Sequence, residues 1–291
     1  MTLRLRPHPD PRSVVGSRRD LAVLRSITWA GYLETSQIAR LHFPSRRVAQ
    51  RRLRALLDHQ MLRAHMQGEA LQRPNVYTMT VRGLELLAGI DPEFATRRPA
   101  RLPRPQKLRH GVAIRDVFVA FAKAEEAHAF DLLDFRFDAD LASDAVLRAA
   151  SLVPDGLAEL RSNGCTRMVG IEVDLGTETL ATIRSKFSAW GRLLALGVAG
   201  VSPRDSRLLV ATTTAVRGAT LVRVMTEVGL PASNVACFTL VELDTLFGAG
   251  RSHELFALPV RAVRIGDGFQ PVEIVANRAT DGAAFRPLRS L

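Results

Sequence analysis

The chain has 291 residues, with 40 Lys and Arg against 29 Asp and Glu, and 47% of its residues are hydrophobic. That length allows about two domains, at ~100–200 residues each. No apolar run approaches the ~18–20 residues of a membrane span, and the basic N-terminus lacks the apolar core of a secretory signal. Only two cysteines are present, which fits a reducing cytosol and excludes a Cys-based zinc site. Composition therefore predicts a cytoplasmic protein with no membrane partner.

The positive charge is concentrated near the N-terminus. Residues 1–110 hold 21 Lys and Arg against 8 Asp and Glu, whereas the rest of the chain is close to neutral. A basic segment on a near-neutral body predicts a nucleic-acid partner. We expect a basic tail (1–19), a helical DNA-binding domain (20–90), a Pro/Arg-rich linker (91–109), an α/β domain (110–250) and a C-terminal extension (251–291). The linker composition suits either a spacer or a tether that contacts phosphates.

Residues 20–90 predict three short helices, two β-like runs and a fourth helix. Asp20, then Thr35 or Ser36, then Pro44-Ser45 mark the expected helix starts, and Thr80 precedes the fourth helix. The β-like runs cover residues 61–66 and 76–79. This is the order of a winged helix-turn-helix, in which the third helix lies in the major groove of DNA.

The third predicted helix has an apolar face and a polar face. Its apolar residues recur at helical spacing, and its opposite face carries guanidinium and amide groups. Such groups suit base edges, and further arginines suit phosphates. We therefore predict contacts with double-stranded DNA from Arg47, Gln50, Arg51 and Arg54, flanked by Arg46, Arg52 and Arg73. A solvated Arg-rich surface is the structural alternative, and RNA is a weaker choice of partner because basic segments do not distinguish nucleic acids.

From residue 110 the pattern changes to a mixture of helices and strands. A helix is expected over 112–129, a strand over 132–137, a hairpin within 153–174, and a long helix over 177–196. A strand over 207–214, a helix over 215–228 and a strand over 235–243 follow. The fold class predicted for the whole chain is α/β with a mixed α+β character.

The hairpin gathers acidic residues. Asn163-Gly164 is a strong signal for a two-residue turn. With that turn Asp155 lies opposite Glu172, and Asp174 shares their face ~6.6 Å further along the strand. Carboxylates at this spacing predict a site for Mg²⁺ or Mn²⁺, which take oxygen ligands. The alternative is a set of acids that are solvated or paired with arginines.

Lys186 lies on the helix predicted to follow the hairpin. It is one of only three lysines in an Arg-rich chain. It flanks the inward stripe of that helix, from which its amine could reach the acidic patch. A compact, titratable amine differs in chemistry from a guanidinium. A surface lysine is the alternative.

Pro154-Asp155, the stretch Ile171-Glu172-Val173-Asp174 and Lys186 together resemble the PD-(D/E)xK nuclease signature. The resemblance implies a restriction-endonuclease-like domain with a central mixed sheet flanked by helices, two acids on a metal ion and a lysine near the scissile phosphate. This chain has Asp174 where the signature normally has its lysine. Some members of that superfamily place the lysine on the following helix, and Lys186 matches that variant.

The whole layout is similar to the replication-relaxation family. The matching stretches are TSQIARLHF, RRLRALLDHQML, VYTMTVRGLELLA, LRHGVAIRDVFVAF, LVPDGLAEL and IEVDLGTETLATIRSKFSAW. Some members act as relaxases in plasmid mobilisation, and others are linked to plasmid replication. The resemblance implies action at the origin of a plasmid or mobile element, with mobilisation or replication proteins, or a second copy of the chain in a homodimer, as partners.

Two functions follow from the sequence. The first is a Mg²⁺-dependent DNA nickase or relaxase in which Asp155 and Glu172 hold the metal. Asp174 would be a third ligand or orient the water, and Lys186 would stabilise the phosphate or help deprotonate that water. A metal-activated water fits better than a tyrosine nucleophile, because both tyrosines lie in the predicted DNA-binding domain. The second is a non-catalytic winged-helix regulator whose degenerate nuclease-like domain serves dimerisation or architecture.

Overall fold

A computed structural model describes residue 7 and residues 16–65, 75–127, 130–162, 164–231 and 233–248. The chain divides into two compact units, residues 1–115 and 116–291. Helix α5 (Pro105–Glu126) contributes residues to both. The predicted extension 251–291 lies outside the described residues. None of the described helices combines the length and the apolar character that a membrane span needs.

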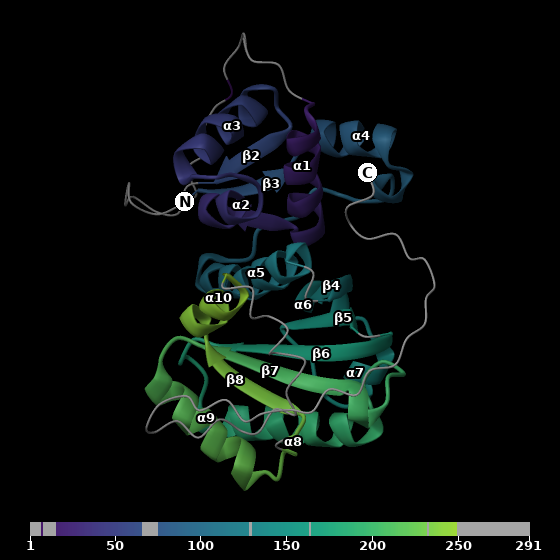
Figure 1. The fold of residues 1–291 in the computed structure, drawn as a ribbon, viewed down its shortest axis with the longest axis vertical. Coiled ribbons are helices and arrows are strands. Elements are labelled where there is room, and N and C mark those ends of the chain that lie inside the picture. The colour runs from purple at the N-terminus through teal and green to yellow at the C-terminus, as the bar shows by residue number, and fades with distance from the viewer. Residues whose placement is uncertain are drawn as a thin grey trace. The chain divides into compact units, whose positions relative to one another are not determined.

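Unit 1 consists of short helices around a small antiparallel sheet (Figure 1). The strands pair in the order β1-β3-β2. The element order is that predicted for a winged helix-turn-helix, with a short first strand added. In chain order the elements are α1 (Arg18–Ala30), β1 (Tyr32–Glu34), α2 (Thr35–His42), α3 (Arg46–Asp58), β2 (Leu62–His65), β3 (Val76–Met79), α4 (Val81–Ile90) and the 3-10 turn η1 (Pro92–Phe94).

Side-chain caps explain where α1, α3 and α4 begin, whereas α2 begins after Glu34 and not after the predicted Thr35 or Ser36. Ser45 caps α3 by accepting from the backbone N–H of Val48, and Thr80 caps α4, both as the sequence predicts. The start of α1 differs from the prediction. Ser17 is its N-cap, and Asp20 is the third helical residue, whose carboxylate accepts from the backbone N–H of Ser17 in a capping box.

The segment predicted as a linker is partly folded against unit 1. Helix α5 begins at Pro105, inside the predicted linker. Leu108 is buried in a small cluster with Tyr32 and Val76, and Leu102 packs against that cluster. An extended spacer was expected because the segment lacks a hydrophobic period, but two leucines suffice once a complementary apolar surface is present.

Unit 2 is built on a five-stranded mixed sheet in the order β4-β5-β6-β7-β8 (Figure 1). The first three strands pair antiparallel, and β6, β7 and β8 pair in parallel. This confirms the predicted fold class. The elements after α5 are β4 (Asp131–Phe137), α6 (Asp138–Leu141), α7 (Ala145–Ala149), β5 (Gly156–Ser162), β6 (Cys165–Asp174), α8 (Leu180–Leu196), the 3-10 turn η2 (Pro203–Asp205), β7 (Ser206–Thr212), α9 (Ala215–Glu227), β8 (Val235–Thr239) and α10 (Leu240–Gly248).

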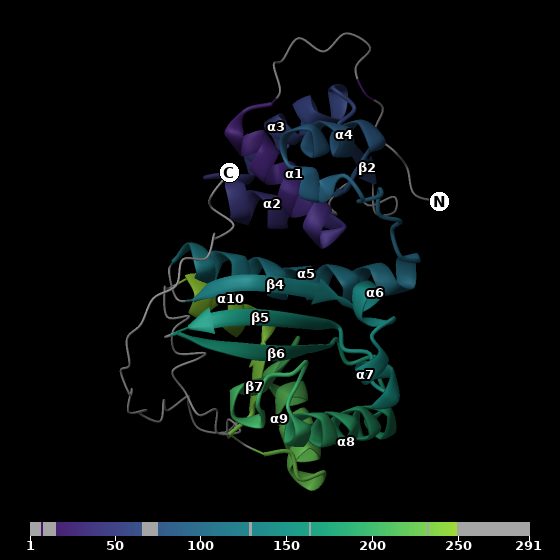
Figure 2. The same cartoon turned by 90° about the vertical axis from the view of Figure 1, so that its right-hand side faces the viewer.

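Helices cover both faces of this sheet (Figure 2). On one face α8 and α9 pack against alternate strand residues, with Phe187 and Trp190 in the core. On the other face Phe118 of α5 makes edge-on ring contacts with Phe135 and Phe137 of β4. Gly170 of β6 lies directly under Trp190, where a Cβ atom would stand 2.0 Å from the indole ring. The indole therefore rests on bare backbone, which fixes α8 over β6.

Candidate functional site

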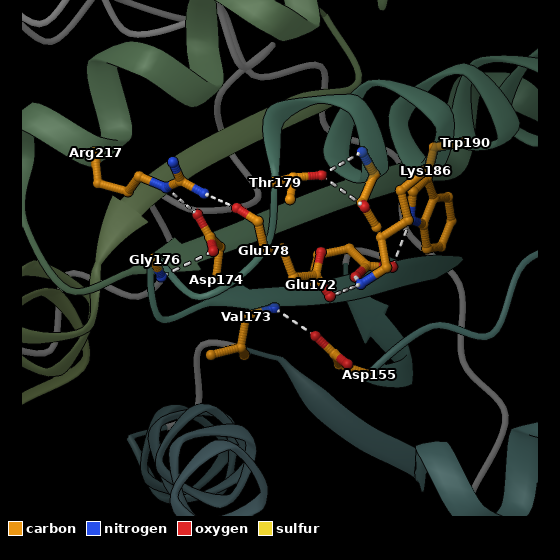
Figure 3. Close-up of polar contacts among 11 residues, drawn as sticks. Asp155, Glu172, Val173, Asp174, Gly176, Glu178, Thr179, Lys186, Trp190 and Arg217 are labelled. Carbon is orange, nitrogen blue, oxygen red and sulfur yellow. Dashed lines mark hydrogen bonds and ion pairs between the residues drawn. The ribbon is translucent and has the colours of Figure 1, made fainter. Parts of the chain in front are cut away.

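The β5–β6 hairpin has the predicted register. Ser162 pairs with Cys165 and Gly156 pairs with Ile171, so the ladder continues toward Asp155 and Glu172. Asp155 directly precedes β5 and is not itself one of the paired residues of the ladder. Its backbone N–H donates to the carbonyl of Ile171 (3.1 Å). Its carboxylate Oδ2 accepts from the backbone N–H of Val173 (2.7 Å), which holds the side chain against β6 (Figure 3).

Glu172 is the buried centre of the site. The residue is only 3% exposed. Its Oε1 accepts a hydrogen bond from the indole Nε1 of Trp190 (2.8 Å), and the Nζ of Lys186 lies 2.8 Å from its Oε2 (Figure 3). Lys186 and Trp190 are one turn apart on α8, so both reach the same carboxylate. The structure therefore brings Asp155, Glu172 and Lys186 to one place.

Electrostatics set this group apart from the rest of the fold. Burial, and after it the nearby Asp155 carboxylate, raise the pKa of Glu172 to about 8, although Lys186 and Trp190 oppose the rise. Burial lowers the pKa of Lys186, but Glu172 and Asp155 outweigh it and hold that pKa above its usual range. The carboxyl groups of Glu172, Asp155 and Glu178 thus act on a single ammonium group, that of Lys186.

Asp174 faces a different partner. Its Oδ2 lies 2.5 Å from the Nε of Arg217 on α9, and its Oδ1 accepts from the backbone N–H of Gly176 (2.9 Å). Among the described residues, no group of three His, Cys, Asp or Glu side chains is placed to hold a metal ion. The predicted convergence of three carboxylates is therefore not formed. A shared face of β6 does not bring Asp174 to the other two carboxylates, because its side chain pairs with Arg217 instead.

Three residues that the sequence reading did not assign to the site complete it: Glu178, Trp190 and Arg217. The Nη2 of Arg217 donates to the backbone carbonyl of Glu178 (3.1 Å), and the Glu178 carboxylate lies 3.5 Å from the Nζ of Lys186. Trp190 could have been found from its spacing to Lys186. Arg217 has no local signal, because its place depends on the parallel pairing of β6 with β7.

The donor set fits a divalent cation in part. Carboxylate oxygens from Asp155 and Glu172 are hard ligands of the kind that Mg²⁺ and Mn²⁺ take. The raised pKa of Glu172 marks a place where added positive charge would stabilise the ionised form. The Nζ of Lys186 already lies against one of these oxygens, so a cation would share Glu172 with it.

Helix α3 carries the second group of predicted residues. Ala49, Leu53 and Leu56 are buried in unit 1. The opposite face exposes five of the side chains predicted to contact DNA: Arg46, Arg47, Gln50, Arg51 and Arg54. The sequence pattern therefore identified the outward face correctly.

Arg52 differs from those five residues. It is half-buried, and its guanidinium forms a two-point ion pair with the buried carboxylate of Asp20. Hydrogen bonds from Arg52 and Ser17 outweigh the effect of burial and lower the pKa of Asp20 to about 2. This ion pair links α3 to α1, whereas the sequence predicted that Arg52 contacts a phosphate. Arg73 lies outside the described residues.

Both tyrosines belong to the core of unit 1. Tyr32 and Tyr77 are each 5% exposed. The ring of Tyr32 lies under the guanidinium of Arg115, with 4.0 Å to the ring centroid. Packing accounts for both side chains.

The model of the replication-relaxation family matches residues 24–201, more than half of the chain. The chain belongs to the replication-relaxation family. Searches of curated proteins and of solved structures each found no match. The region matched by the family model contains α3, Asp155, Glu172 and Lys186. It ends before Arg217.

Proposed function

We propose that this replication-relaxation protein binds double-stranded DNA through the exposed face of α3. The observation that carries the proposal is the separation of the two helix faces, with aliphatic residues buried and five polar side chains turned outward. Arginine and glutamine can read base edges in the major groove, and arginine also neutralises phosphates. The positive charge of residues 1–110 supports the same partner.

Binding of a fluorescent duplex, followed by anisotropy in EDTA, tests this function. We expect affinity to fall with salt, with a slope of several phosphates. Arg47→Ala with Arg51→Ala should weaken binding at least tenfold, on the order of 1 kcal/mol for each arginine. Arg148→Ala with Arg223→Ala removes the same charge from exposed positions of unit 2 and should change affinity much less. Equal losses from the two double variants would contradict the role of α3.

A second function, metal-dependent cleavage of a DNA strand, is favoured by the buried group of Asp155, Glu172 and Lys186. In this proposal the two carboxylates would hold Mg²⁺ or Mn²⁺. When bound, the ion would offset phosphate charge and lower the pKa of a coordinated water. Lys186 would donate to a phosphate oxygen, and Trp190 would keep Glu172 oriented by its hydrogen bond. An origin of a plasmid or mobile element would be the substrate.

Incubation of supercoiled plasmid carrying the cognate origin with Mg²⁺ tests the second function. We expect conversion to open circles by the wild type, and loss of conversion in Asp155→Asn and Lys186→Met. Glu85→Gln, an exposed acid of unit 1, serves as the control. Calorimetric titration with Mn²⁺ should in parallel show weaker binding by Asp155→Asn. DNA binding without cleavage or metal binding would leave a non-catalytic regulator with a nuclease-like domain.

A further inference from the structure

A basic groove lies between the start of α1 and α3 in unit 1. Its volume is 840 Å³, and it opens to solvent. We use the name basic groove for this depression, which is lined by five arginines: Arg18, Arg19, Arg51, Arg52 and Arg54. Two of them, Arg18 and Arg19, belong to α1 and were not among the residues predicted to contact DNA.

Three of the five guanidinium groups have no acidic partner within the part of the chain that the structure describes. Arg52 is neutralised by the buried Asp20, and the Nη2 of Arg54 lies 2.8 Å from Oδ1 of Asp58, which also lines the groove. Among the described residues no ion pair joins an acid to the remaining arginines: Arg18, Arg19 and Arg51. All three are exposed. The basic groove therefore keeps a net positive charge that favours an anion.

Apolar side chains also line the basic groove. Phe43, Val48 and Ala55 contribute to it, and the guanidinium of Arg19 lies 5.7 Å from the centroid of the Phe43 ring. A lining that combines apolar side chains with guanidinium groups matches a sugar–phosphate strand. The deoxyribose would contact carbon atoms while the phosphates meet arginines, which bind them with paired N–H donors.

We propose that the basic groove holds the sugar–phosphate backbone of one DNA strand, with Arg18 and Arg19 as phosphate contacts. The inference rests on DNA binding by α3 and adds a second contact from α1. Arg51 lines the groove and also lies on the exposed face of α3, so a strand in the groove would run beside the surface proposed to read bases. Contacts of this kind position a protein on DNA without reading its sequence.

The experiment compares salt dependence on two duplexes of unrelated sequence. Each phosphate contact adds about 0.9 to the slope of log affinity against log salt, so Arg18→Ala with Arg19→Ala should lower that slope by about 2 on both duplexes. Arg18→Lys with Arg19→Lys keeps the charge and should retain most of the slope. Arg148→Ala with Arg223→Ala is the matched control and should leave the slope unchanged.

The outcomes separate this inference from DNA binding itself. Failure of the wild type to bind either duplex would overturn both. Binding by the wild type with an unchanged slope in Arg18→Ala/Arg19→Ala would overturn the groove alone. The remaining arm of the experiment measures binding of a polyglutamate peptide and of inorganic phosphate, each at constant ionic strength. If the alanine variant lost its binding to the peptide or to phosphate but kept its binding to DNA, the groove would be a site for an acidic peptide or a free phosphate. The proposal would then fail.

Discussion

Glu172 should titrate near pH 8, and Trp190 offers a direct readout because its indole N–H donates to that carboxylate. Replacing Trp29 by phenylalanine leaves Trp190 as the only tryptophan. In EDTA we expect the fluorescence of Trp190 to change with pH and to show an inflection near pH 8. Lys186→Met removes the ammonium group that stabilises the ionised form, so the inflection should move up by about 1–3 pH units.

The magnitude follows from the difference between an ordinary pKa of 4.5 and a pKa of about 8 for Glu172. Below pH 4.5 the group is protonated in the folded and the unfolded chain. Between the two values only the unfolded chain releases the proton, so the free energy of unfolding of unit 2 falls as pH rises. At about 1.4 kcal/mol per pH unit the loss reaches about 5 kcal/mol by pH 8, and this group adds no further loss above it.

Denaturant unfolding from pH 5 to 9, followed through Trp190, measures that loss. Glu172→Gln should remove both the fluorescence inflection and this part of the pH dependence. Lys186→Met should keep losing stability above pH 8, where the wild type levels off. An inflection below pH 5, or one that survives in Glu172→Gln, would refute the assignment of a raised pKa to Glu172.

Three further predictions concern stability, each measured by denaturant unfolding. Asp20→Asn breaks the ion pair with Arg52 and should lower the free energy of unfolding of unit 1 by about 2 kcal/mol at pH 7. Because the pKa of Asp20 is lowered to about 2, that difference should vanish as pH falls from 3.8 through 2, and persistence at pH 2 would contradict it. Gly170→Ala forces a methyl group into Trp190 and should cost unit 2 about 2–3 kcal/mol, so a neutral result would contradict the close approach. Arg217→Met leaves a largely buried acid unpaired and should cost roughly 2 kcal/mol, whereas an exposed control, Arg223→Met, should cost almost nothing.

Much of the fold is encoded in short-range signals. Ser45 and Thr80 begin helices because their hydroxyl oxygens accept from backbone N–H groups within the first turn. The hairpin register follows from a two-residue turn, since a ladder that starts at Ser162 and Cys165 fixes every later pair. Asp155 and Glu172 could be placed together on that basis alone.

The parts that the sequence did not predict depend on partners distant in the chain. Asp174 meets Arg217 because β6 pairs in parallel with β7, whose following helix carries the arginine. Leu102 and Leu108 pack in the cluster around Tyr32, although the proline-rich composition of their segment suggested a spacer. In the sequence Arg52 resembles its exposed neighbours on α3, and only the fold places Asp20 beside it. Contacts between residues so distant in the chain leave no periodic pattern in the sequence, so they could not be predicted from it.

Site-directed crosslinking tests the central claim most directly, namely that the exposed face of α3 contacts DNA. Cys165 is exposed and Cys237 is buried, so Cys165→Ser gives a background in which an introduced surface cysteine is the main target for a photoactivatable label. Labelled Gln50→Cys should crosslink to a bound duplex, and labelled Arg148→Cys should not. If the Gln50→Cys protein binds the duplex and forms no crosslink, or if both positions crosslink equally, then α3 is not the DNA-contacting surface.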